Sequence, residues 1–397
     1  MAITTPDTLD DEADYAVDEL EDLDERLAAL RATKPAAWVR CFGQPAVIFT
    51  SYELVHAAFK DETTFPSAEF YANTVTEVMG RTMQAMEGAE HRVNRALASP
   101  GFRQRLMPDL MKPLLEPVAH ELIDRFEPRG RADLVAEFTR AYPAKIILAM
   151  LGLPQHAEDD VTRWALGMLD IQMNYEHALA CSKEFEDFVR PHLHERRDNP
   201  GDDLLSKLAT EEIDGHRLTD TEIFAFLKLL FPAGADTTYL GLGSTIYALL
   251  KNPDQLARVV ADPDLCAAAA EEGVRWSPPV PLLPRRNRND VVWNGVAIPA
   301  GTPLIFAIGA ANRDPAVFPD GDRFDIDRRP PVTLTFGFGV HYCLGVHLAR
   351  AELEIALRAL VTRLPRLRFD GDDSDVRIGG SFIQLLRGPN KLPVRFD

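Results

Sequence analysis

The sequence predicts a mainly helical protein with small β-sheets near both ends of the chain. Helical patterns follow one another from His91 to about Lys251, separated by prolines and a turn at 199–201. Short β-like runs lie before this region and again at 291–307 and 378–396. We find no internal repeat and no linker, so we expect one domain over 26–397 after an acidic, poorly ordered lead over 1–25.

The charge distribution excludes several function classes. The net charge is −18, and the first 25 residues hold eleven acids and no Lys or Arg. An acidic chain repels nucleic-acid backbones, and an acidic start does not suit a secretion signal. The sequence also has no apolar run of 18 residues, which excludes a membrane anchor. We therefore expect a cytoplasmic protein that binds no nucleic acid.

The elements before residue 91 include two strands and one helix. The runs Ala37–Cys41 and Ala46–Thr50 read as strands joined by a turn at 42–45. Ser51 is placed to cap a helix that continues to about Lys60. Residues 65–90 show little periodicity, so we expect a long loop there. Further along, Asn294-Gly295 predicts a hairpin turn.

A glycine-rich segment at 336–345, FGFGVHYCLG, leads into a helix predicted from about Leu344 to Leu364. Cys343 thus lies beside a helix N-terminus, where partial positive charge favours a thiolate. Glycines at 337, 339 and 345 allow positive φ and close approach to a flat ligand. Cys343 is therefore a candidate metal ligand, and a buried structural cysteine is the alternative.

A second unusual segment, 232–238 (PAGADTT), interrupts a helix that starts with the capping box Thr219–Glu222. An interior proline costs about 3 kcal/mol and an interior glycine about 1 kcal/mol relative to alanine. Asp236 adds a carboxyl among apolar neighbours, which is unfavourable unless it is paired. Such local conflicts are typical of a functional site, where carbonyls and the Thr237 hydroxyl could hold water or dioxygen. A helix that ends at Pro232 and restarts is the alternative.

Both segments resemble motifs of the cytochrome P450 family. Residues 336–345 match F-x-x-G-x-x-x-C-x-G at every defined position, and 233–238 are similar to A-G-x-D/E-T-T. Pro232 and Phe338 replace residues more usual in the family. The resemblance extends from Ala37 to Val394 and implies a single-domain cytochrome P450 fold, mainly α with small sheets. It implies that Cys343 ligates the iron of haem b, and that Asp236 and Thr237 deliver protons during O2 activation.

The resemblance also assigns supporting residues. It implies that Glu272 and Arg275, three apart on a helix, join Arg323 to hold the coil before Cys343. Cofactor contacts are expected from a set that includes cations for the haem propionates: His91, Arg95, Ala233, Arg285, Phe336, Gly337, His341 and Gly345.

The implied activity is insertion of one oxygen atom of O2 into a hydrophobic small molecule, by hydroxylation or epoxidation. The chain has no dinucleotide fingerprint, so the resemblance implies electrons from a ferredoxin and an NAD(P)H-dependent ferredoxin reductase. We expect a monomer. Pocket candidates are apolar residues at positions that line the family's substrate site: Phe70, Tyr71, the methionines at 79, 83 and 86, 164–173, Leu229, Ala233, Leu282, Leu283, Phe382 and Ile383.

Three alternatives have different consequences. A haem-thiolate peroxygenase would turn over with peroxide but not with ferredoxin and O2. A non-catalytic haem-binding protein would not need the Asp236–Thr237 pair. A cysteine hydrolase using Cys343 and His341 would need an orienting carboxylate that the neighbouring sequence lacks.

Overall fold

The computed structural model describes residues 6, 8–213, 215–329, 332–380 and 385–397. The chain forms two compact units, each built from three separate segments. The first unit comprises Met1–Phe70, Leu240–Cys343 and Gly371–Leu392. The second comprises Tyr71–Tyr239, Leu344–Asp370 and Pro393–Asp397. The expected single domain over 26–397 stays a prediction.

A four-stranded sheet organises the first unit. Its order is β1 (Ala36–Cys41), β2 (Gln44–Phe49), β9 (Pro303–Phe306) and β6 (Leu283–Arg286). β1 and β2 form the expected hairpin, whose turn residues Phe42 and Gly43 have φ of 51° and 73°. β2 pairs with β9 in parallel, so chain segments about 250 residues apart are joined by Val47 opposite Leu304.

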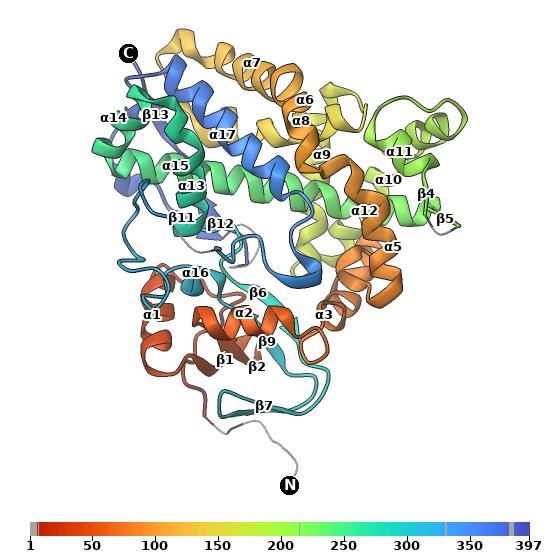
Figure 1. The fold of residues 1–397 in the computed structure, drawn as a ribbon, viewed down its shortest axis with the longest axis vertical. Coiled ribbons are helices and arrows are strands. Elements are labelled where there is room, and N and C mark those ends of the chain that lie inside the picture. Colours follow the sequence, from red (N-terminus) through yellow and green to blue (C-terminus); the bar gives the residue numbers. More distant parts are fainter. Residues whose placement is uncertain (1–5, 7, 214, 330–331, 381–384) are drawn as a thin grey trace. The chain divides into compact units, whose positions relative to one another are not determined.

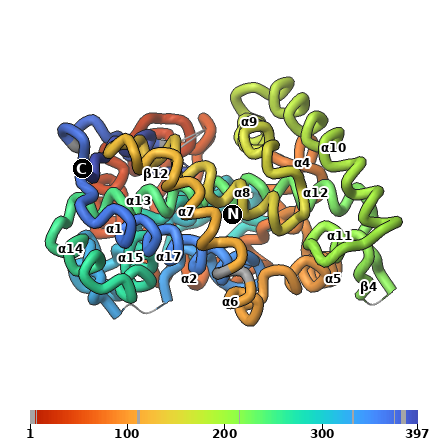
Figure 2. The backbone as a smooth tube through the Cα atoms, turned by 90° about the horizontal axis from the view of Figure 1, so that it is seen from above, coloured from red at the N-terminus to blue at the C-terminus, as the bar shows by residue number. Residues whose placement is uncertain are grey.

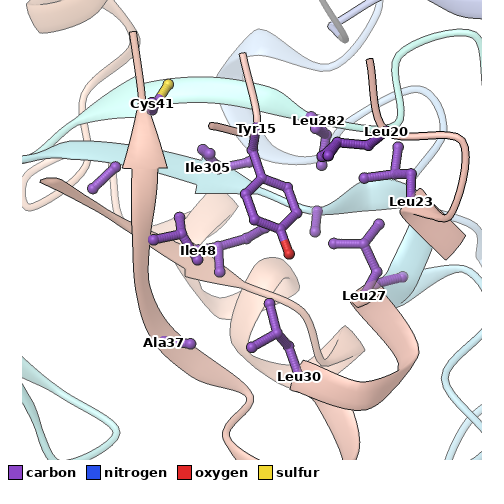
Figure 3. Packing of buried hydrophobic residues seen from close by; sticks show 14 of the residues in the cluster. Tyr15, Leu20, Leu23, Leu27, Leu30, Ala37, Cys41, Ile48, Leu282 and Ile305 are labelled. Atoms are coloured by element: carbon purple, nitrogen blue, oxygen red, sulfur yellow. The ribbon is translucent and has the colours of Figure 1, made fainter. Parts of the chain in front are cut away.

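Each face of this sheet is covered by one helix. α1 (Leu23–Thr33) packs Leu23, Leu27 and Leu30 against alternate strand residues such as Ile48 and Ile305, as Figure 3 shows. On the other face, α2 (Tyr52–Lys60) buries Val55, Ala58 and Phe59 against Val47, Phe49 and Phe306. Ser51 caps α2 by accepting a hydrogen bond from the Leu54 N–H, as predicted.

The described residues of the acidic lead differ from the poorly ordered segment expected over 1–25. Tyr15, Ala16 and Leu23 are fully buried between α1 and the sheet. Asp14 accepts hydrogen bonds from the N–H groups of Phe42 and Gly43 in the β1–β2 turn. The acids there satisfy backbone donors of the hairpin, which is why this stretch is ordered despite its charge.

The remaining elements of the first unit lie between residues 240 and 392. They are most of α13 (Thr237–Lys251), α14 (Pro253–Ala261), α15 (Cys266–Trp276), β7 (Val291–Trp293), β8 (Val296–Ile298), α16 (Ile308–Ala311), β11 (Ile378–Gly380) and β12 (Arg387–Pro389). β7 and β8 form the hairpin predicted at Asn294-Gly295, and both turn residues have positive φ. This turn geometry matches the twist of antiparallel strands.

The second unit is mostly helical (Figure 1). Its longer helices are α5 (Gly88–Ala98), α7 (Glu116–Phe126), α8 (Ala141–Met150), α9 (Glu158–Leu169), α10 (Tyr175–Asp198), α11 (Leu204–Thr210), α12 (Asp220–Phe231) and α17 (Val346–Arg363). α9 and α10 lie side by side (Figure 2). Its strands form the sheet β10 (Arg368–Phe369), β13 (Pro393–Arg395) and β3 (Arg131–Asp133), and the pair β4 (Glu212–Ile213) and β5 (His216–Arg217).

The long loop expected over 65–90 was wrong in part. Helix α3 spans Ser67–Thr74 and the short helix α4 spans Thr76–Met79, and both bury apolar side chains despite their weak periodicity. Their helical state is set by packing rather than by a sequence pattern. Within the described ranges, every helix is too short or too polar to cross a membrane.

Candidate active site

The segment around Cys343 forms a tight loop in the first unit. The Gly337 N–H donates to the Leu334 carbonyl at 2.9 Å, and the Cys343 N–H donates to the Phe336 carbonyl at 2.9 Å. Between them, a short 3-10 turn covers Gly339–His341. The loop therefore folds back on itself, so that Cys343 lies beside Phe336. α17 begins three residues later at Val346, close to the predicted start of this helix.

Two glycines in this loop are required by its conformation. Gly337 and Gly339 have φ of 70° and 76°, in the left-handed region that other residues rarely adopt. A Cβ on Gly339 would lie 2.6 Å from the Phe59 carbonyl oxygen at the end of α2. A Cβ on Gly345 would have no atom within 4 Å among the described residues. Gly339 thus sets the distance between the loop and α2, whereas the position of a Cβ on Gly345 is open.

Cys343 differs from the other cysteines in its exposure. Cys41, Cys181 and Cys266 are buried, whereas Cys343 is only partly buried. Burial raises the pKa of Cys41 to about 12, so that thiol stays protonated at neutral pH. Cys343 is therefore the cysteine that is best placed to meet a ligand.

The four cations predicted to meet propionates are divided between the units. His341 and Arg285 lie in the first unit, and His91 and Arg95 lie on α5 in the second. Arg285 is buried, with its guanidinium 5.7 Å from the centre of the Phe306 ring. His341 places Nε2 3.7 Å from a Glu62 carboxylate oxygen. Burial, together with the charge of Arg95, lowers the pKa of His91.

The interrupted helix at 232–238 contains a π turn, η9 (Pro232–Asp236), between α12 and α13. The predicted capping box at Thr219 and Glu222 starts α12. The wider π turn accommodates Pro232, which lacks the N–H that a regular helix would use. Directly after this turn, at the start of α13, the Thr237 hydroxyl donates to the Ala233 carbonyl at 2.6 Å. The hydroxyl oxygen is thereby left to accept a hydrogen bond.

Asp236 is a buried acid without a hydrogen-bond partner. Its residue is 1% exposed, and neither carboxyl oxygen has a hydrogen-bond partner among the described residues. Burial raises the pKa of Asp236 to about 8, and the Arg140 charge opposes this rise. The side chain is therefore a neutral acid at pH 7, able to give up a proton.

A second buried acid, which the sequence analysis missed, contacts Thr238, two residues after Asp236. Glu352 on α17 is 2% exposed and hydrogen-bonds with the Thr238 side chain. Burial raises its pKa well above the ordinary value. The pattern of α17 gave one available signal, an acid at a position otherwise expected to face the core.

The buried ion cluster on α15 differs from the prediction at its third member. Arg275 donates to both Glu272 carboxylate oxygens at 2.7 Å, as expected for this pair. The third residue is Arg328, whose Nε donates to Glu272 at 3.2 Å. Arg323, the predicted member, has a side chain that is 69% exposed and contributes only its carbonyl oxygen. The coil turns back after Arg323, which brings Arg328 to the carboxylate.

The pocket candidates have mixed outcomes. Leu282 is fully buried in the core cluster between α1 and the sheet, and its place in a substrate pocket stays a prediction. Leu283 and Phe70 are also packed in the first unit, whereas Phe382 and Ile383 lie outside the described residues. Leu229 and Ala233, four apart near η9, are less buried than their neighbours, and Tyr71 is half-buried. Met83 and Met86 line a small cavity in the second unit with Arg81, Asn94, Ala98, Leu218, Glu222 and Phe226.

Comparisons with known proteins agree with the two motifs. The family model described as Cytochrome P450 matches residues 145–390. The chain is 35% identical to mycinamicin IV hydroxylase/epoxidase of Micromonospora griseorubida over 380 residues, 93% of this chain and 94% of that protein. It is 32% identical to vitamin D(3) 25-hydroxylase of Pseudonocardia autotrophica, over 92% of each chain.

Solved structures show the same similarity. The cytochrome P450 PksS of the Bacillus subtilis 168 bacillaene polyketide synthase superposes with a TM-score of 0.88 at 30% identity, over 95% of this chain and 97% of that one. The single fold, the interrupted helix and the cysteine loop therefore have one explanation: the chain belongs to the cytochrome P450 family, as a monooxygenase of the bacterial type.

Proposed function

We propose that this enzyme oxidises a hydrophobic small molecule with a haem b whose iron is ligated by the Cys343 thiolate. Family membership implies a haem-thiolate cofactor and the use of O2. The observation that carries the assignment of Cys343 is its position, partly buried at the end of a loop held by Gly337 and Gly339. When bound, a haem-thiolate group supplies an electron-rich iron that favours cleavage of the O–O bond.

The residues around this cysteine fit such a group. A thiolate is a soft donor suited to iron, and the other three cysteines are buried. The open space beside Gly345 suits a flat ligand, because a larger side chain would occupy it. Arg285 and His341 of the first unit, and His91 and Arg95 of the second, each carry N–H donors that suit carboxylates.

Asp236 and Thr237 have properties suited to proton delivery. Because its pKa is raised to about 8, Asp236 holds a proton at pH 7 that it can release during turnover. Thr237 donates its own proton to the Ala233 carbonyl, so its oxygen remains available as an acceptor. We assign Asp236 as the acid that releases the proton. Thr237 is then the hydroxyl that orients the group that accepts the Asp236 proton.

The substrate class follows from the apolar candidates and the relatives. Leu229 and Ala233 present apolar side chains beside the π turn. Two relatives are named as a mycinamicin IV hydroxylase/epoxidase and a vitamin D(3) 25-hydroxylase. We infer a hydrophobic small-molecule substrate that is hydroxylated or epoxidised.

We propose that the electrons come from a ferredoxin reduced by an NAD(P)H-dependent reductase. Arg92, Arg103 and Arg105 are exposed in the second unit and could attract an acidic partner. Lys112 lies close to these arginines in the sequence, but its side chain lies outside the described ones. Charge reversal at the three arginines should slow reduction at low salt and have little effect at high salt.

The decisive experiment is the absorption spectrum of the reduced, carbon monoxide-bound protein. We expect the strongly red-shifted Soret band of a thiolate-ligated haem, and its loss in Cys343→Ala. Cys266→Ala is the matched control and should keep the band. A band that persists in Cys343→Ala would show that another residue ligates the iron.

A further inference from the structure

The contact between α8 and the π turn η9 places a cation beside Asp236. Both α8 and η9 belong to the second unit and pack against each other. The approach is close, since a Cβ on Gly234 would lie 2.9 Å from the Ile147 side chain. Arg140 lies at the start of α8, directly after a second π turn, η6 (Val135–Thr139). The absence of a side chain at Gly234 thus allows α8 to bring Arg140 near the turn.

An aromatic ring holds the Arg140 side chain in this position. Its guanidinium carbon is 5.5 Å from the centre of the Tyr239 ring, a cation–π distance. Tyr239 follows Asp236 by three residues, so the two side chains share one face of the helix. Tyr239 is 4% exposed, whereas Arg140 is exposed. The guanidinium therefore lies between solvent and the face that carries Asp236.

Three other cations on elements that contact η9 are paired with acids elsewhere. Three cations form ion pairs: Lys145 of α8 with Glu158 at 2.9 Å, Arg163 of α9 with Glu184 at 2.9 Å, and Lys228 of α12 with Glu186 at 2.6 Å. Tyr142 of α8 donates its hydroxyl to the Leu115 carbonyl. Burial raises the pKa of Asp236 to about 8, and the positive charge of Arg140 opposes this rise.

We propose that Arg140 is a positioning residue for proton delivery, because it stabilises the carboxylate that Asp236 becomes after releasing its proton. The O–H bond of Asp236 breaks, and the proton passes to a water molecule that is hydrogen-bonded to the Thr237 oxygen. The Asp236 carboxylate then takes a proton from solvent water on the side of Arg140. Without the guanidinium, the buried carboxylate forms less readily, and proton release becomes slower.

This inference rests on the role proposed for Asp236, but its main test does not need catalysis. The carbonyl stretch of a protonated buried carboxyl can be followed by infrared difference spectroscopy against pH in the holoenzyme. Asp236→Asn identifies the band of Asp236, and Glu352→Gln identifies that of the other buried acid. The midpoint of the Asp236 band then reports its ionisation directly.

Arg140→Gln should raise this midpoint by about one pH unit, since an opposite charge is removed. Arg140→Lys should restore most of the original midpoint. Arg163→Gln is the matched control, because Arg163 is also exposed and lies 5.3 Å from the centre of the Trp164 ring. An unchanged midpoint in Arg140→Gln would overturn the proposal.

A catalytic readout separates this proposal from the role of Asp236. In Arg140→Gln we expect a larger solvent isotope effect on turnover. The pH profile of turnover should move to higher pH, in the same direction as the infrared midpoint of Asp236. If Asp236→Asn keeps full turnover with unchanged coupling of electrons to product, Asp236 is not the proton donor. Arg140 then has no role in proton delivery. An infrared midpoint that moves in Arg140→Gln would in that case still establish the electrostatic contact.

Discussion

Arg328 donates through Nε to a Glu272 carboxylate oxygen at 3.2 Å, and both side chains are almost fully buried. Arg328 also donates to the carbonyls of Pro319, Asp320 and Arg323, so it ties the coil to α15. Arg328→Gln should therefore lower the free energy of unfolding by about 2 kcal/mol, the range of hydrogen bonds to charged groups. Urea unfolding measures this change.

Arg323→Gln is the control for this prediction. Its side chain is mostly exposed, so the substitution should change the free energy of unfolding by less than about 0.5 kcal/mol. Equal losses in the two variants would contradict the assignment of Arg328 as the third member of the cluster.

Substitution by alanine should destabilise the protein much more at Gly339 than at Gly345. Gly339→Ala forces a Cβ against the Phe59 carbonyl and keeps a left-handed φ, which should cost about 1–3 kcal/mol. Gly345→Ala meets open space at an ordinary φ of −88° and should cost only a few tenths of a kcal/mol. Thermal unfolding of the two variants without haem distinguishes these effects. A stable Gly339→Ala protein would argue against the loop conformation described.

Asp236 should make the protein less stable as pH rises. Its carboxyl is charged in the unfolded chain above about pH 4 but stays neutral in the folded chain until about pH 8. The unfolded state therefore binds fewer protons in this window, and the free energy of unfolding falls by at most about 1.4 kcal/mol per pH unit. Asp236→Asn should remove this contribution.

The measurement is a series of urea titrations of both proteins between pH 5 and pH 8. The stability of Asp236→Asn relative to wild type should increase steadily across the series. A constant difference would mean that Asp236 is already ionised in the folded protein at pH 5.

Lys228 depends on Glu186 for its burial. Lys228 has a side chain that is 6% exposed, and its Nζ lies 2.6 Å from Glu186 and 3.5 Å from the Val78 carbonyl. Glu186→Gln should cost about 3 kcal/mol, because it leaves a buried ammonium without its counter-charge. Adding Lys228→Met should recover much of this loss, since the double variant has no buried charge to satisfy.

An exposed ion pair on α10, the helix that carries Glu186, is the reference for these variants. Lys183 and Asp187 are 75% and 58% exposed, so Lys183→Met should change stability by less than about 0.5 kcal/mol. Independent, additive losses in Glu186→Gln and Lys228→Met would show that the two side chains do not interact.

Local rules predicted much of the fold correctly. The capping residues Ser51 and Thr219 and the turn at Asn294-Gly295 all lie where the sequence placed them. Each of these signals depends on a few neighbouring residues and on backbone preferences that tertiary contacts do not override.

Features set by distant contacts were harder to predict. The choice between Arg323 and Arg328 depends on how a coil turns back, and no spacing rule encodes this. Asp14 and Tyr15 look like part of a solvated acidic stretch until the β1–β2 turn supplies donors for Asp14. The partnership of Arg140 with Asp236 joins residues almost a hundred positions apart, so only the packing of α8 against the π turn exposes it.

The parallel pairing of β2 with β9 has a consequence for the order of events during synthesis. The hairpin of β1 and β2 can form early, but its partner strand leaves the ribosome only after more than 250 further residues have been translated. Until then, one edge of β2 carries backbone groups with no strand to bond them. A nascent chain of this enzyme must therefore keep an unpaired strand from joining neighbours for most of its translation, which makes that edge a natural site for chaperone protection.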